Sequence, residues 1–165
     1  MSDNNWKAMT AQEACDVLDF WAKTSWPMDL TETITHAAQL GWTAEEEDDG
    51  ERFLVNEVSG LSIPEVDAIE MPSGEIATIS LRSTDAIREI TPESTAFLND
   101  QYTLLYREAA TRWGAGEQSD IENGGRYAQW DLENGGRIGI TVSTRSVSIS
   151  FDTPQYAKVL RELGE

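Results

Sequence analysis

The residues that decide the fold are 125–151, which read GRYAQWDLENGGRIGITVSTRSVSISF. Apolar and polar side chains alternate in three consecutive runs of this stretch, which is the pattern of half-buried β-strands. Asn134-Gly135-Gly136 separates the first two runs, and an Asn-Gly pair supplies the positive φ that a tight hairpin needs. Thr144-Arg145 separates the second and third runs. The pattern predicts a three-stranded meander with one apolar face and one face of small polar residues.

Helical patterns before and after the meander are expected to cover its apolar face. Four helices are predicted from capping residues and apolar stripes, at residues 10–22, 31–40, 91–114 and 153–163. Residues 42–58 and 65–83 each read as a hairpin, and short turns between neighbouring strands imply a mainly antiparallel sheet. We therefore predict a single α+β domain over residues 1–165, with about six to seven strands and with helices packed on one face. Residues 1–9 are expected to form a loose lead-in and residues 115–125 a mobile loop.

The composition is strongly acidic. Thirty Asp and Glu residues against 12 Lys and Arg give 165 residues a formal charge of −18. Such a charge repels nucleic acid and anionic membranes, and it favours rapid capture of a basic protein. The alternative is that the acidity only keeps the protein in solution.

Several features of the sequence predict a cytoplasmic protein. Cys15 is the one cysteine, so no internal disulfide can form, which fits a reducing compartment. The first residues lack the basic and apolar regions of a signal peptide, and no apolar run reaches the length of a membrane helix.

No catalytic set can be recognised, and we predict that the protein is not an enzyme. His36 is the one histidine, no Gly-x-Ser-x-Gly elbow occurs, and no glycine-rich loop has the sequence of a phosphate site. No metal or cofactor is expected. The sequence Glu-Asn-Gly-Gly-Arg occurs at 122–126 and again at 133–137. The repeat is either a duplicated binding loop or a chance recurrence of Asn-Gly-Gly, a sequence that favours tight turns.

Acidic residues concentrated near predicted turns are the candidates for partner binding. The candidates are Glu45, Glu46, Glu47, Asp48, Asp49 and Glu51 on the first hairpin, with Asp120, Glu122 and Glu133 near the predicted mobile loop. Trp26, which lies in a loop, is a candidate anchor, because tryptophan is enriched at the energetic centres of interfaces.

Several short motifs resemble a family of small actinobacterial proteins. They are the helix that ends in Leu40-Gly41-Trp42, Arg112-Trp113-Gly114, the strand Gln129-Trp130-Asp131-Leu132, the turn and strand over 133–140, and residues 147–156. Members of that family look like immunity proteins of polymorphic toxin systems. The resemblance implies a cytoplasmic antitoxin that binds and blocks one secreted toxin domain.

Three functional hypotheses follow. The first is an immunity protein, acting as a monomer or weak dimer, whose acidic surface binds a basic toxin domain without nucleic acid or membrane. The second is a secretion or assembly chaperone with an apolar interface that depends weakly on salt. The third is a small-molecule-binding domain, which requires a concave apolar pocket with converging polar groups.

Overall fold

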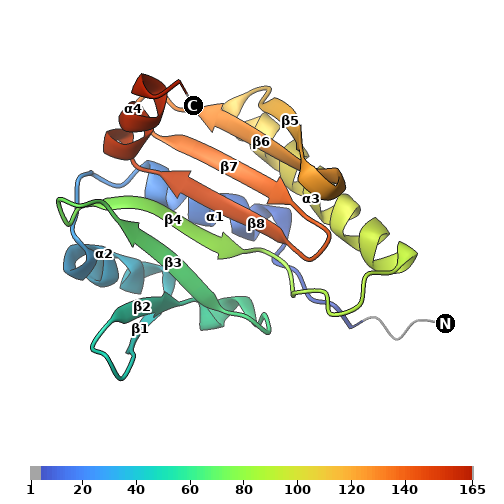
Figure 1. The fold of residues 1–165 in the computed structure, drawn as a ribbon, viewed down its shortest axis with the longest axis horizontal. Coiled ribbons are helices and arrows are strands. Elements are labelled where there is room, and N and C mark those ends of the chain that lie inside the picture. Colours follow the sequence, from blue (N-terminus) through green and yellow to red (C-terminus); the bar gives the residue numbers. More distant parts are fainter. Residues whose placement is uncertain (1–4, 165) are drawn as a thin grey trace.

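A computed structural model describes residues 5–164 of the chain, and it contains one antiparallel sheet with helices on both of its faces (Figure 1). The strands are β1 (Thr43–Glu46), β2 (Arg52–Val55), β3 (Glu65–Glu70), β4 (Ile76–Arg82), β5 (Glu117–Ile121), β6 (Gly125–Asp131), β7 (Arg137–Val142) and β8 (Val147–Asp152). The α-helices are α1 (Ala11–Ala22), α2 (Leu30–Ala37), α3 (Pro92–Trp113) and α4 (Pro154–Glu162). The predicted α+β class is confirmed.

The predicted meander forms the second half of the sheet, whose strand order is β1-β2-β3-β4-β8-β7-β6-β5. Ile140 faces Ile149 and Ile138 faces Phe151 across β7 and β8, so the alternation places these side chains on one buried face. β4 pairs with β8 and joins the meander to the N-terminal hairpins. Both copies of the repeated Glu-Asn-Gly-Gly-Arg lie at hairpin turns, the first between β5 and β6 and the second between β6 and β7.

The sheet has eight strands, so the expected count of six to seven was too low. The additional strand is β5, which lies inside the segment that was expected to be a loop. All five of its side chains are exposed, so the sequence lacks the alternation that marks a half-buried strand. The predicted lead-in is also partly structured, because Ala8 forms a bridge with Thr84; residues 1–4 of it lie outside the described residues.

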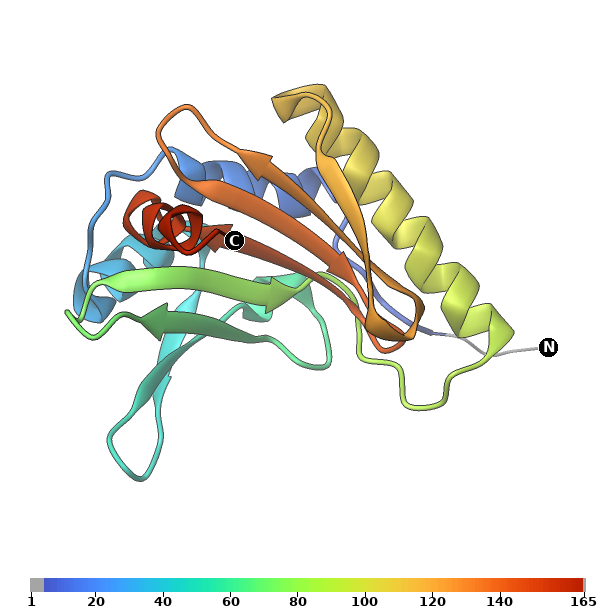
Figure 2. The same cartoon turned by 45° about the horizontal axis from the view of Figure 1, so that its top comes forward.

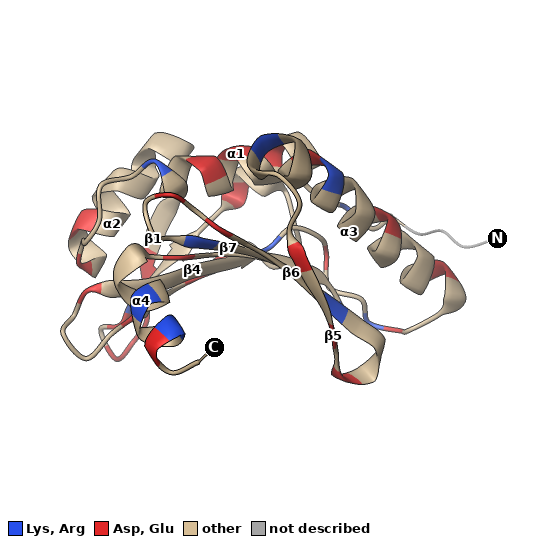
Figure 3. Ribbon diagram, turned by 90° about the horizontal axis from the view of Figure 1, so that it is seen from above, with Lys and Arg blue, Asp and Glu red and all other residues tan. Residues whose placement is uncertain are grey.

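Most helices cover the apolar face, as predicted, but α4 does not. Helices α1, α2 and α3 lie on one side of the strands, and α4 lies on the other (Figure 3). The Thr153 hydroxyl donates to the carbonyl oxygens of Ile76 and Ala77, and Arg161 pairs with Asp131 on the polar face. The expectation that all helices share one face is therefore wrong for α4.

The core lies between α1, α3 and the sheet. Trp21 of α1 is fully buried and packs its ring against Phe20, Trp26 and Trp42. Trp130 of β6 packs against Trp113 of α3. Buried aromatic and branched side chains therefore connect both helices to the strands.

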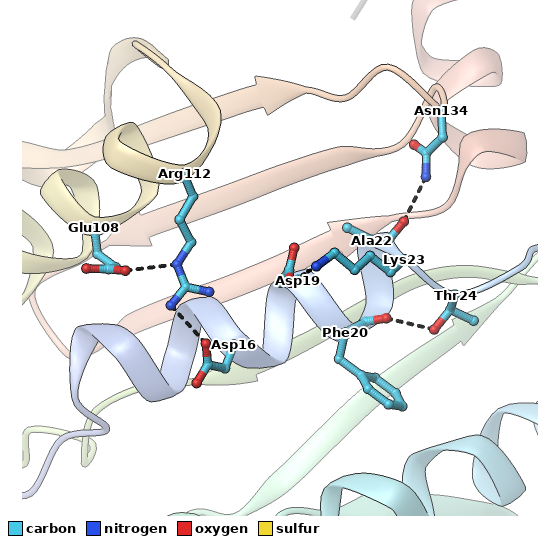
Figure 4. Close-up of polar contacts among 9 residues, drawn as sticks. All are labelled: Asp16, Asp19, Phe20, Ala22, Lys23, Thr24, Glu108, Arg112 and Asn134. Carbon is cyan, nitrogen blue, oxygen red and sulfur yellow. Dashed lines mark hydrogen bonds and ion pairs between the residues drawn. The ribbon is translucent and has the colours of Figure 1, made fainter.

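Polar contacts fix α1 to its neighbours (Figure 4). The Arg112 guanidinium of α3 lies 2.8 Å from a carboxylate oxygen of Asp16 on α1 and 2.8 Å from one of Glu108 on its own helix. The Asn134 amide donates to the Ala22 carbonyl over 2.8 Å, which ties the β6–β7 turn to the end of α1. These contacts hold the two helices in register above the meander.

Replacing Gly116 with alanine is expected to lower the free energy of unfolding by about 1–3 kcal/mol, because the added methyl overpacks the core. A Cβ at this position would lie 2.5 Å from the buried Trp130 ring. Urea unfolding measures the change, and Ala115→Ser is the control because Ala115 is exposed. Equal stability of the two variants would contradict the close packing of Trp130 against Gly116.

Candidate functional site

The acidic hairpin comprises β1, β2 and the turn that joins them. It carries six of the candidate residues, Glu45, Glu46, Glu47, Asp48, Asp49 and Glu51, all of them exposed. β1 is one edge of the sheet, and the hairpin projects away from the remaining strands (Figures 1 and 2). The structure therefore brings these six carboxylates together on one projecting element.

A groove of about 810 Å³ lies beside this hairpin and shares Glu51 with it. Its lining comes from the start of α2, the end of the acidic hairpin, β3 and the β3–β4 turn, namely residues 27–32, 50–52, 68, 70 and 73–75. Five of the lining residues are acidic, Asp29, Glu32, Glu51, Glu70 and Glu75, and one, Arg52, is basic. We call this feature the acidic groove.

Three charged residues of the acidic groove already form hydrogen bonds within the chain. Asp29 and Glu32 form the capping box of α2: the Asp29 carboxylate accepts from the Glu32 amide at 2.8 Å, and the Glu32 carboxylate accepts from the Asp29 amide at 3.2 Å. Arg52 donates to the Thr31 hydroxyl over 2.7 Å. The ion pairs found within residues 5–164 all lie elsewhere, on α1, on α3 and around Asp131. The groove therefore presents carboxylates without neutralising ion pairs.

The remaining acidic candidates lie elsewhere. Asp120 is on β5, and Glu122 follows that strand directly, so both lie at the edge of the sheet opposite to β1. Seven strand spacings of about 4.8 Å separate these two edges. Glu133 lies in the β6–β7 turn, near the end of α1. The structure thus does not gather the nine acidic candidates into one surface.

Trp26 belongs to the hydrophobic cluster. Its side chain is half-buried, its ring stacks on Phe151, and its indole N–H donates to the Trp21 carbonyl over 2.9 Å. The indole N–H of Trp26 and one part of its ring are therefore occupied within the chain, and only the exposed part of the ring is accessible to a partner.

One group of side chains in the described part of the chain has the geometry to hold a cation. Carboxylate oxygens of Glu47, Asp49 and Glu51 at the tip of the acidic hairpin lie within 4.8 Å of one another. All three residues are exposed, and Asp49 also accepts a hydrogen bond from the Glu51 amide.

The two residues with nucleophilic or basic potential are engaged within the fold. Cys15 is fully buried, and burial raises the pKa of its thiol to about 12, so it remains protonated at neutral pH. The Thr24 hydroxyl donates to the Phe20 carbonyl and therefore accepts from His36 Nε2, while Gln39 lies 3.2 Å from His36 Nδ1. Both ring nitrogens of His36 are therefore occupied by contacts within the fold.

A second polar cluster lies between α4 and the sheet. The Arg137 side chain is 7% exposed, and its guanidinium bonds an oxygen of Asp131 at 3.0 Å. Burial acts to raise the pKa of Asp131, but hydrogen bonds from Arg137 and Arg161 outweigh it and hold that pKa below its usual value. The neighbouring Asp152 behaves in the opposite way, because burial raises its pKa in spite of a hydrogen bond from Thr78.

Asparagine substitutions of these two aspartates are expected to have opposite effects at pH 7. The lowered pKa of Asp131 means that its ionised form adds stability above the ordinary pKa of 3.8, so Asp131→Asn is destabilising. The raised pKa of Asp152 means that stability is lost as the pH rises through that pKa, so Asp152→Asn is stabilising. Urea unfolding at pH 7 tests both signs. The gain from Asp152→Asn should shrink by about pH 4, whereas the loss from Asp131→Asn should shrink only below 3.8, as the pH falls through the lowered pKa of Asp131. Effects of the same sign at pH 7 would contradict this account.

Sequence reasoning missed the acidic groove. Its residues come from four separated segments, and Glu70 and Glu75 carry no local pattern that distinguishes them from other surface acids. A partial signal was the run of acids on the first predicted hairpin, which forms one wall of the groove. Only the packing of α2 beside two hairpins shows that these turns share one surface.

The fold and the groove define an α+β protein with an antiparallel sheet and an anionic surface at one corner. The chain matches a family of unknown function, DUF6301, over residues 12–153, and it belongs to that family. Among curated proteins and solved structures, none matches the chain. The matched range contains both hairpins that line the groove and ends directly before α4.

Within residues 5–164, every helix is too short or too polar to cross a lipid bilayer.

Proposed function

We propose that this protein is a cytoplasmic, non-catalytic immunity protein that binds a basic toxin domain and blocks it. The acidic hairpin and the acidic groove form the contact surface. The motifs around Trp42, Trp113 and Trp130 resemble those of small actinobacterial proteins that look like immunity proteins, and this resemblance supports the proposal, as does the net charge of −18. A surface of one charge sign steers an oppositely charged partner and raises the rate of association.

The observation that carries the proposal is the placement of the unneutralised carboxylates. They lie side by side on the acidic hairpin and in the acidic groove, and no ion pair among the described residues neutralises them. Like charges held close together oppose one another, and a basic partner relieves that repulsion. A solubilising role alone does not require a groove next to the acidic hairpin.

The proposal predicts that the adjacent reading frame encodes a secreted protein with a basic C-terminal domain, and the experiment is co-expression of that domain with this chain. We expect that domain to arrest growth alone, and we expect growth to recover when this chain is present. Calorimetric titration of the purified pair should show affinity that falls steeply between about 50 mM and about 500 mM salt. Tight binding that is insensitive to salt would instead favour the chaperone hypothesis, and the absence of both rescue and binding would refute the proposal.

A further inference from the structure

The sheet is split between β2 and β3. These strands pair at only two positions, Leu54 with Val66 and Val55 with Glu65. Further along, β2 continues beside β1 as far as Arg52, and β3 continues beside β4 as far as Glu70. Figure 2 shows the two hairpins diverging from this junction. Among residues 5–164, the outer half of β2 is therefore paired only with β1, and the outer half of β3 only with β4.

The divergence leaves main-chain groups of β3 without a strand opposite. The Asn56 amide donates to the Pro64 carbonyl over 2.8 Å. This hydrogen bond shows which residues of β2 and β3 direct their main-chain groups toward each other. Because hydrogen-bonding direction alternates along an antiparallel strand, Val66 and Ala68 direct their N–H and C=O groups toward β2. β2 no longer lies opposite Ala68, so within the described residues this position is an open strand edge. An open edge is a template for an added strand.

The open edge faces the acidic groove. Ala68 lines the groove together with Glu51, Glu70 and Glu75, and the volume of about 810 Å³ falls in the range of ordinary binding sites. A strand added at Ala68 would place alternate side chains in the groove, because side chains alternate between the two faces of a strand. Those side chains would meet five carboxylates and one guanidinium, that of Arg52, which already bonds to the Thr31 hydroxyl.

We propose that an extended basic segment of the partner adds to β3 as an antiparallel strand at Ala68. Its alternate Lys or Arg side chains enter the acidic groove, and its main chain hydrogen-bonds to the edge of β3. This inference rests on the proposed function, since it states how the same surface grips a basic protein. A second copy of this chain does not fit, because both copies carry a charge of −18.

The geometry specifies which main-chain groups of the segment matter. Residues directly opposite in an antiparallel hydrogen-bonded pair have side chains on the same face. The residue opposite Ala68 therefore directs its side chain into the acidic groove and its own N–H toward β3. In an alternating Lys-Val peptide with lysines in the groove, the lysine amides bond to β3 and the valine amides point outward.

Calorimetric titration with synthetic octapeptides tests this arrangement. An alternating Lys-Val peptide is expected to bind with a Kd below about 1 mM, and an alternating Glu-Val peptide is not. N-methylation of the lysine amides should weaken binding at least about tenfold, whereas N-methylation of the valine amides should leave it unchanged. Equal affinity of the two methylated peptides, or no binding by the unmodified Lys-Val peptide, would overturn the proposal.

Variants of the protein provide a second readout. Ala68→Pro removes the open N–H, and proline is tolerated at a strand edge, so folding is retained while the Lys-Val peptide binds about tenfold more weakly. Ala68→Ser keeps the N–H and should bind as the wild type does. If the toxin domain still binds with steep salt dependence but Ala68→Pro has no effect on either ligand, strand addition is wrong and the proposed function stands. If the peptide effects appear but no toxin domain is bound or neutralised, the immunity function fails.

Discussion

Replacing Trp21 with alanine is expected to lower the free energy of unfolding by about 3–5 kcal/mol, the usual loss when a buried tryptophan is truncated. The side chain is fully buried, and its ring centroid lies 5.0 Å from that of Phe20, 5.7 Å from that of Trp42 and 5.9 Å from that of Trp26. These neighbours lie on α1, directly before β1 and in the segment before α2. Their rings cannot all close over the cavity that alanine leaves, because each is held by its own element.

Trp21→Phe is the matched control for this prediction. It retains an aromatic ring and removes an indole N–H that has no hydrogen-bond partner among the described residues, so the loss should be smaller, about 1–2 kcal/mol. Leu104→Ala on the exposed side of α3 should change stability by less than about 0.5 kcal/mol. Urea unfolding gives all three values. A loss for Trp21→Ala no larger than that for Leu104→Ala would show that the aromatic cluster is not the core.

Reversing the charge of Glu46 and Asp48 together is expected to slow association with the toxin domain by about tenfold or more at low salt. Both residues lie on the acidic hairpin and are exposed. Removing two carboxylates and adding two ammonium groups weakens the field that attracts a basic partner. Dissociation should change much less if these residues remain at the rim of the contact. Stopped-flow kinetics across a range of salt concentrations measures the effect.

Asp120→Lys with Glu122→Lys is the matched control, because it changes the net charge by the same amount at the opposite edge of the sheet. The control should slow association far less than the hairpin variant, since charges beyond one Debye length of the contact, about 8–10 Å at ordinary salt, are screened. An equal effect of both variants would mean that only the total charge matters. A larger effect of the control would place the contact at β5.

The sequence predicted most elements because their local chemistry was consistent with the fold. Alternation fixed the faces of β6, β7 and β8, and capping residues such as Thr10 and Thr91 fixed the starts of helices. β5 was not predicted because an exposed edge strand needs no apolar face and therefore shows no alternation of apolar and polar residues. The position of α4 was not predicted because its apolar residues do not specify which face of the sheet the helix meets. In the structure Ala157 is the buried residue of α4, and Arg161 pairs with Asp131.

The candidate site was predictable only in part. The run of acids from Glu45 to Glu51 is contiguous in sequence, so its concentration on a hairpin could be read directly. The groove depends on contacts between segments that are far apart, and the splitting of β2 from β3 depends on where their pairing stops. Asp120 and Glu133 could not be separated from the hairpin acids, because the sequence does not show how far apart two turns lie in the folded protein.

The most direct test of the central claim is amide hydrogen exchange of this protein alone and in complex with the toxin domain. An acidic corner that captures a basic partner predicts slower exchange in the complex across β1, β2, the start of α2 and the β3–β4 turn, with β5, β6 and α3 unchanged. Protection confined to β5, β6 or α3, with the acidic hairpin and the acidic groove exchanging as in the free protein, would contradict the account.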